Sequence, residues 1–178
     1  MKPALLVIDL QTFFQTLVPE DNITDNVSKL VNKCYENSTP VVFTQHHDPQ
    51  PLSVMAKFWN SPIVYGTKGW ELRSDIKPLF DTNKAIMIEK TRYDAFWNTN
   101  LKEKLLEKEV DTVIVTGVMT NLCCETTART AFCNDFNVLF AKDASATRSI
   151  ECHEATLLNI EAGFGKVLET KEILEILG

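Results

Sequence analysis

The hydrophobic residues of this chain fall into short runs that alternate with longer amphipathic stretches. Short runs rich in β-branched and aliphatic side chains predict buried strands, whereas apolar residues at helical spacing predict helices. We predict strands at residues 4–9, 40–45, 85–89, 110–116, 137–141 and 166–169. We predict helices at residues 24–37, 71–80, 99–108, 120–133 and 150–162 and at the C-terminus.

Strands that alternate with helices indicate βαβ units, and therefore a parallel sheet covered by helices on both faces. Thr24 or Asn22 is expected to cap the first long helix. Residues 46–67 are rich in proline and aromatic side chains. This segment is too long for a simple connection, which is typical of a functional lid.

Three reactive side chains stand where predicted strands end. Asp9 closes the first strand, Lys90 follows the third, and Cys123 follows the fourth after a short turn. Ligands of open α/β sheets bind beyond the carboxyl ends of the strands, so an acid, an amine and a thiol are expected to meet there. Together they form a cysteine nucleophile with a base and a cation.

The composition is that of a globular protein, and we predict one domain over residues 1–178. The net charge of -6 argues against a nucleic-acid partner. The N-terminus shows no signal peptide, and the sequence contains no membrane-spanning apolar stretch. The five cysteines have no framework spacing, so we interpret them as reduced thiols in a cytoplasmic protein.

Four segments resemble the isochorismatase-like cysteine hydrolases, which include nicotinamidases, N-carbamoyl amidohydrolases and isochorismatase. They are LLVIDLQTFF (5–14), EKTRYDAFWNTNL (89–101), TGVMTNLCCETTARTAF (116–132) and KDASAT (142–147). The resemblance implies a Rossmann-like, three-layer α/β/α sandwich around a six-stranded parallel sheet of order 3-2-1-4-5-6. It also implies a dimer or tetramer of identical chains.

By the same resemblance, the catalytic triad is Asp9, Lys90 and Cys123. A cis peptide bond is expected between Val118 and Met119, and the backbone N–H groups of Met119 and Cys123 are expected to form the oxyanion hole. The position of Cys123 in the first turn of a helix, near Lys90, predicts a thiolate. Cys124 is the competing nucleophile, but it points about 100° further around the helix.

A zinc ion is bound beside the triad in many nicotinamidases, through an Asp-x-His pair after the second strand and a further His. Here His46 and Asp48 occupy the pair in reversed order, and the further His is missing. Because catalytic zinc usually has three protein ligands, we expect no cofactor and no tightly bound metal. A weak divalent-ion site at His46 and Asp48 is the alternative.

Aromatic and polar side chains near the strand ends predict a small-molecule pocket. The expected substrate-binding residues are Gln11, Phe14, His46, Trp59, Tyr93 and Trp97. Arg92 and Arg148 are further candidates as anchors for an anionic substrate. Core packing is an equally good interpretation for Phe13 and Phe96.

The leading functional hypothesis is a cysteine-dependent hydrolase of a small, non-peptide amide or ureide, acting through a thioester. A vinyl ether hydrolase of the isochorismatase type is one alternative, although an intact Asp-Lys-Cys set favours amide chemistry. A non-catalytic binding protein is another, against which the three triad residues argue. A redox-sensing thiol protein is disfavoured because adjacent cysteines form strained disulfides.

Overall fold

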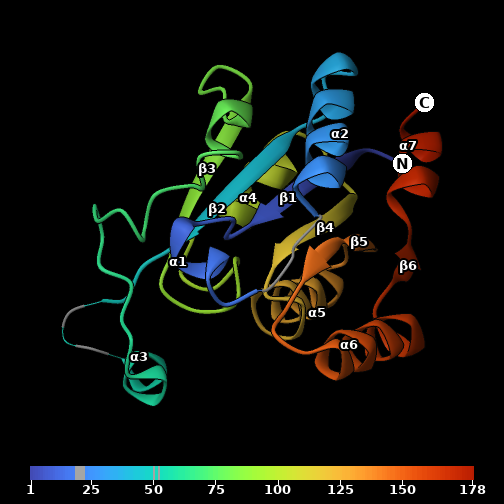
Figure 1. The fold of residues 1–178 in the computed structure, drawn as a ribbon. Helices are drawn as coiled ribbons and strands as arrows, with labels where there is room; N and C mark the ends of the chain where they lie inside the picture. The colour runs from blue at the N-terminus through green and yellow to red at the C-terminus, as the bar shows by residue number, and fades with distance from the viewer. Residues whose placement is uncertain (19–22, 50, 52) are drawn as a thin grey trace.

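A six-stranded parallel sheet lies at the centre of the protein, with helices on both faces (Figure 1). The computed structural model describes residues 1–18, 23–49, 51 and 53–178. The strands are β1 (Pro3–Ile8), β2 (Val41–His46), β3 (Ala85–Lys90), β4 (Thr112–Val118), β5 (Asn137–Ala146) and β6 (Lys166–Leu168). Their order is β3-β2-β1-β4-β5-β6, which confirms the predicted fold.

The helices alternate with the strands along the chain. They are α1 (Thr12–Gln15), α2 (Ile23–Glu36), α3 (Val54–Trp59), α4 (Leu101–Glu107), α5 (Glu125–Cys133), α6 (Ile150–Gly163) and α7 (Thr170–Leu177), together with a 3₁₀ turn η1 (Lys77–Leu79) and a π-helical turn η2 (Thr120–Cys124). Among the residues that the structure describes, every helix is too short or too polar to span a bilayer.

Two hydrophobic cores lie on opposite faces of the sheet. Alternate residues of β1 supply both, because successive side chains of a strand point to opposite faces. Leu5 and Val7 pack with α2 and α7, whereas Leu6 and Ile8 pack with α4, α5 and α6. The strands are covered on both sides, which is why they consist of nearly continuous apolar runs.

Gly117 allows β4 to pass close to the end of β1. Its φ angle is +107°, and a Cβ atom here would lie 2.1 Å from the carbonyl oxygen of Ile8. An alanine therefore cannot occupy this position without moving backbone. The chain continues through the cis Val118–Met119 peptide bond, which the family resemblance predicts, into η2.

The predicted helix at 71–80 is wrong except for the turn η1. The N–H of Arg73 donates to the carbonyl of Leu10, and the N–H of Thr12 donates to the carbonyl of Glu71. Since these backbone groups pair with the segment after β1, they are held in an extended arrangement. The lid segment instead contains a helix that was not predicted, α3.

Two other boundaries differ from the prediction. Strand β5 extends beyond the predicted 137–141 to Ala146, because Ser145 and Ala146 pair with the end of β4. Helix α2 already begins at Ile23, so Thr24 lies inside it rather than at its cap. The alternative cap, Asn22, lies outside the described residues.

Candidate active site

Asp9, Lys90 and Cys123 meet at the carboxyl edge of the sheet, as the sequence predicts. Lys90 Nζ lies 2.6 Å from Asp9 Oδ2 and donates to Cys123 Sγ at 3.4 Å. The third contact of the ammonium is a hydrogen bond to the carbonyl of Arg92 at 2.9 Å. The cation therefore joins the acid to the thiol, with both charged side chains fully buried.

The carboxylate of Asp9 is fixed from a second side by Thr44. The hydroxyl of Thr44 in β2 donates to Asp9 Oδ1 at 2.5 Å, and it accepts from the Asp9 backbone N–H at 3.1 Å. Asp9 itself has a φ angle of +48°, which directs the chain out of the sheet directly after β1. Thr44 was missed by the sequence analysis, although it is a polar residue within an apolar strand.

The turn Thr120–Cys124, called the nucleophile turn after the role predicted for Cys123, is π-helical and separates the two adjacent thiols. The carbonyl of Met119 accepts from the N–H groups of Leu122 and Cys124 at the start of this turn. Cys123 faces the cavity described below, whereas the Cys124 thiol points toward the carbonyl of Thr116 at 3.8 Å in the core. Only Cys123 is therefore placed beside Lys90.

The charges of the site keep Lys90 protonated and do not produce a thiolate at rest. Burial acts to lower the pKa of Lys90, but Asp9 and Cys123 more than offset it, so its pKa is raised. Burial raises the pKa of Cys123 to about 12, with Lys90 opposing the rise and Asp9 adding to it. Burial and Asp9 together therefore outweigh Lys90 and favour the thiol, whereas the helix position and Lys90, considered alone, favour the thiolate.

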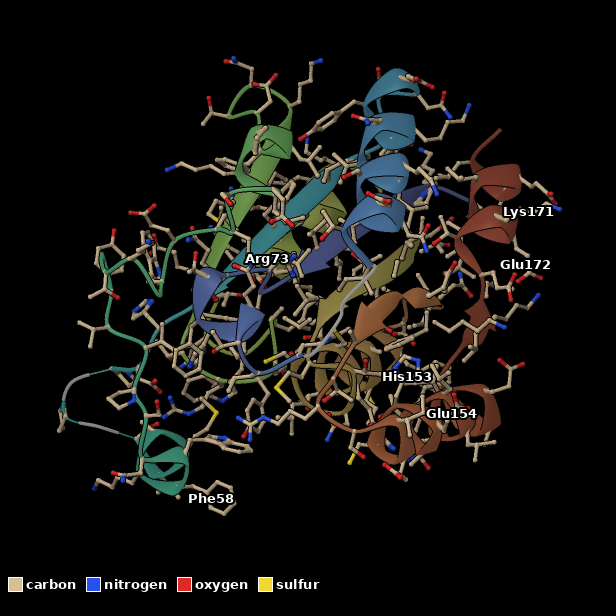
Figure 2. All side chains as sticks on the ribbon, viewed as in Figure 1. Phe58, Arg73, His153, Glu154, Lys171 and Glu172 are labelled. Atoms are coloured by element: carbon tan, nitrogen blue, oxygen red, sulfur yellow. The ribbon has the colours of Figure 1, made fainter. Side chains whose placement is uncertain are left out.

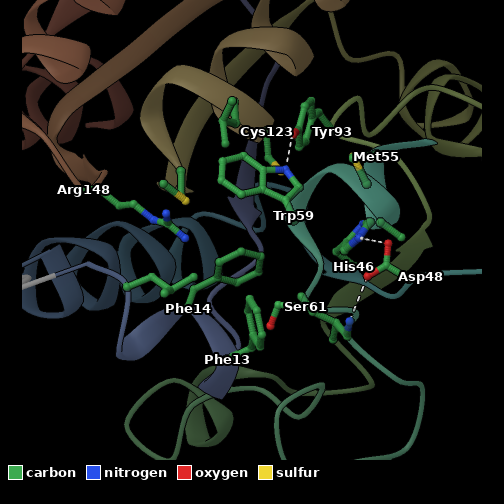
Figure 3. A pocket seen from close by; sticks show the side chains of 15 residues that line it. Phe13, Phe14, His46, Asp48, Met55, Trp59, Ser61, Tyr93, Cys123 and Arg148 are labelled. Atoms are coloured by element: carbon green, nitrogen blue, oxygen red, sulfur yellow. Dashed lines mark hydrogen bonds and ion pairs between the residues drawn. The ribbon is translucent and has the colours of Figure 1, made fainter. Parts of the chain in front are cut away.

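A cavity of about 130 Å³ opens in front of Cys123 (Figure 3). Its wall is formed by residues of α1, β2, α3, the loops after β2, β3 and β5, and the nucleophile turn. The lining includes the predicted residues Phe14, His46, Trp59, Tyr93, Met119 and Cys123. Met55, Ser61 and Ile63 also line it and were missed, since they lie in a segment whose path the sequence does not predict.

Two predicted substrate-binding residues lie elsewhere. The side-chain amide of Gln11 donates to the carbonyls of His46 and Trp70 and accepts from the His46 N–H. Gln11 therefore joins the ends of β1 and β2 to the chain around residue 70, and it does not line the cavity. Trp97 lines a shallow hollow separate from the cavity, where its ring centroid lies 4.7 Å from Arg92 Cζ.

Trp59 spans the mouth of the cavity. Its Nε1 donates to the Tyr93 hydroxyl at 2.5 Å, and the guanidinium of Arg148 lies over its ring at 5.1 Å (Figure 3). The indole thereby connects the loop after β3 to the loop after β5. Arg148 also lines the cavity.

His46 and Asp48 form the polar end of the cavity. His46 Nε2 lies 3.4 Å from Asp48 Oδ1, and Asp48 Oδ2 accepts from the Ile63 N–H at 2.8 Å. Burial acts to raise the pKa of Asp48, but its bonds to His46 and Ile63 outweigh this effect and lower it. The part of the chain that the structure describes contains no group of three or more His, Cys, Asp and Glu that could hold a metal ion. Two side chains fall short of the three protein ligands that a catalytic zinc ion usually has.

Comparison with known proteins gives consistent matches along the whole chain. A family model described as the isochorismatase domain matches residues 3–172. "Nicotinamidase 3" of Arabidopsis thaliana is 40% identical over 173 residues, which cover 96% of this chain and 86% of that protein. A nicotinamidase structure from Bacillus subtilis is 28% identical, with a TM-score of 0.83, and the match covers 95% of this chain and 100% of that one.

A second solved structure shows the likeness of the fold. It is a cysteine hydrolase from Pseudomonas syringae pv. phaseolicola 1448A, with a TM-score of 0.91 at 24% identity. The match covers 99% of this chain and 92% of that one.

Proposed function

This chain belongs to the isochorismatase family of hydrolases, and we propose that it hydrolyses the carbon–nitrogen bond of a small amide or ureide through a thioester on Cys123. The observation that carries the proposal is the buried cluster of Asp9, Lys90 and Cys123, of which Cys123 lines the cavity. A thiol beside a carboxylate and an ammonium has the groups that nucleophilic acyl transfer requires.

In the first half-reaction, Asp9 takes the thiol proton as the Cys123 sulfur attacks the carbonyl carbon of the substrate. A base is needed at this moment because the buried thiol is protonated at rest. Lys90 stabilises the negative charge that forms on sulfur at 3.4 Å. The N–H groups of Met119 and Cys123 hold the oxyanion of the tetrahedral intermediate. Asp9 then gives its proton to the leaving nitrogen, so ammonia or an amine departs and a thioester remains.

In the second half-reaction, water attacks the thioester carbonyl. Asp9 accepts a proton from the water, and the same N–H groups hold the second oxyanion. The carbon–sulfur bond then breaks, the sulfur regains a proton from Asp9, and the carboxylic acid leaves. The two half-reactions together consume one amide and one water, and they return the enzyme to its starting state.

Nicotinamide is the first substrate to test. The support is the 40% identity to a protein named nicotinamidase and the aromatic wall formed by Phe14, Trp59 and Tyr93. A flat aromatic amide fits such a wall, and His46 offers an imidazole at the polar end. A cytoplasmic location and an assembly of two or four chains stay predictions from the sequence.

The test measures release of ammonia from nicotinamide and from an N-carbamoyl amino acid, and hydrolysis of a vinyl ether. Cys123→Ala should abolish amide turnover, whereas Cys124→Ala, its matched neighbour, should keep the catalytic thiol and most of the rate. Asp9→Asn should severely slow acylation in a protein that still folds, although with lower stability. Added hydroxylamine should capture the acyl group as a hydroxamate in the wild type and in Cys124→Ala, but not in Cys123→Ala.

Other results would favour the alternatives. Vinyl ether hydrolysis that survives Cys123→Ala but not Asp9→Asn would indicate isochorismatase-type chemistry. Binding of these compounds without turnover would indicate a non-catalytic protein on this fold.

A further inference from the structure

The nucleophile turn is held in place by side chains from α6 and from the segment that leads into it. Thr120 Oγ1 lies 3.0 Å from His153 Nδ1, and Thr147 Oγ1 donates to Asn121 Oδ1 at 2.7 Å. Thr120 and Asn121 are the two residues after Met119, whose N–H group is assigned to the oxyanion hole. A shift at Thr120 therefore moves the groups that act on the substrate.

His153 is the only titratable partner in these two contacts (Figure 2). It is half-buried on α6, and Thr120 is fully buried. The groups that act on the imidazole are Glu154 on the same helix, the carbonyl of Lys142 on β5, and Thr120 itself. Glu125, at the start of α5, bonds instead to Thr156, one turn further along α6.

We propose that His153 is a positioning residue for hydrolysis, whose neutral ring accepts the hydroxyl hydrogen of Thr120 and so fixes the turn that presents Cys123. The inference rests on the proposed function, because it assigns a role to a residue that does not touch the substrate. The ring of His153 acts through Thr120 and Met119.

The chemistry of the contact makes it sensitive to protonation. A neutral imidazole can accept at Nδ1, whereas an imidazolium is a donor at both nitrogens. When His153 gains a proton, Nδ1–H donates to the Thr120 hydroxyl oxygen, and the hydroxyl must turn its own hydrogen toward another partner. Burial lowers the pKa of His153, and Glu154 and the Lys142 carbonyl oppose this effect only in part. The neutral form is therefore the working form, and acidification removes it.

The experiment compares wild type with His153→Asn, His153→Ala and a helix control, Leu158→Ala, whose side chain is exposed on α6. Asparagine places an oxygen near the position of Nδ1, so it keeps the acceptor without titrating. Values of kcat and KM for the hydrolysed amide are measured from about pH 5 to 9, with the imidazole titration of His153 followed by NMR.

We expect His153→Ala to lower kcat about tenfold where the wild-type ring is neutral, the effect of one lost hydrogen bond, with little change in KM; at acid pH the two proteins should converge. His153→Asn should keep most of kcat at neutral pH. It should also lack the acid limb, which is the fall in kcat at low pH that follows the His153 titration in the wild type. The inference is overturned if that limb persists in His153→Asn, or if His153→Ala matches Leu158→Ala.

A second readout requires no substrate. The rate of iodoacetamide alkylation at Cys123, read by peptide mass spectrometry, should rise severalfold in His153→Ala, because the buried thiol is held less firmly. It should return toward the wild-type rate in His153→Asn, while exposed Cys133 reacts equally in all variants. An unchanged Cys123 rate overturns the inference. A protein that hydrolyses no amide but shows this pattern refutes only the proposed function.

Discussion

Replacing Lys90 by methionine tests whether the buried ion pair organises the site. Methionine has a similar length but no charge, so Asp9 Oδ2 would lose the cation that lies 2.6 Å away. Both side chains are fully buried, and removal of one partner from such a pair leaves an uncompensated charge that costs about 3–5 kcal/mol. That is a large part of a total stability of roughly 5–15 kcal/mol.

The double variant Asp9→Asn/Lys90→Met distinguishes the loss of the whole ion pair from the loss of one of its charges. Removal of both charges leaves neither one unpaired, so the double variant should regain most of the stability that Lys90→Met loses. Asparagine is also compatible with the positive φ of residue 9. All of these variants should be inactive, so stability and activity will change independently.

The assay is urea unfolding at neutral pH, followed by fluorescence and circular dichroism. The surface pair of Lys2 and Glu109 supplies the control, since Lys2 Nζ and Glu109 Oε2 lie 2.8 Å apart with both side chains exposed. Lys2→Met should leave the free energy of unfolding almost unchanged. The reasoning is refuted if Lys90→Met is as stable as Lys2→Met. It is also refuted if the double variant loses the sum of the unfolding free energies that Asp9→Asn and Lys90→Met lose separately.

Three further predictions concern the backbone, the thiols and the metal. Gly117→Ala should destabilise the protein by more than about 3 kcal/mol in thermal unfolding, because the new Cβ would meet the Ile8 carbonyl. Gly163→Ala is the control and should not destabilise the protein, because the space around its Cβ is open. Burial raises the pKa of Cys34 from 9.0 to about 12, so its contribution to stability is complete below pH 9 and is lost as the pH rises toward 12. Urea unfolding at about pH 8 and pH 10.5 should show this loss, and Cys34→Val should reduce it; an equal loss in the variant would contradict the assignment. Extended treatment with EDTA should leave amide hydrolysis unchanged, and a loss that zinc restores would point to a metal at His46 and Asp48.

The sheet and the meeting of Asp9, Lys90 and Cys123 could be predicted because both depend on local, repeated features of the sequence. Apolar runs indicated the strands, and the parallel arrangement then brought their carboxyl ends to one edge. Asp9 and Lys90 stand directly at such ends, so their meeting follows from topology. The confirmed order of the strands came from the family resemblance rather than from the runs themselves.

The parts that failed depend on tertiary contacts. The stretch around Arg73 has apolar residues that suggest a helix, but its backbone pairs with Leu10. Thr44 can be found only once β2 is placed beside β1. Whether Cys123 is a thiol or a thiolate depends on burial, Asp9 and Lys90 together. The helix position alone takes no account of burial, which raises the pKa of the thiol.

The cavity draws its reactive groups and its walls from different parts of the chain. Asp9, Lys90 and Cys123 belong to the sheet and the nucleophile turn, whereas Met55, Trp59 and Ile63 come from one segment after β2. Mutations in that segment can therefore alter which molecules fit without disturbing strand register or the buried charges. This separation makes the protein evolvable, because selection can exchange the substrate while the chemistry stays intact, and directed libraries confined to residues 53–63 are the corresponding route for engineering.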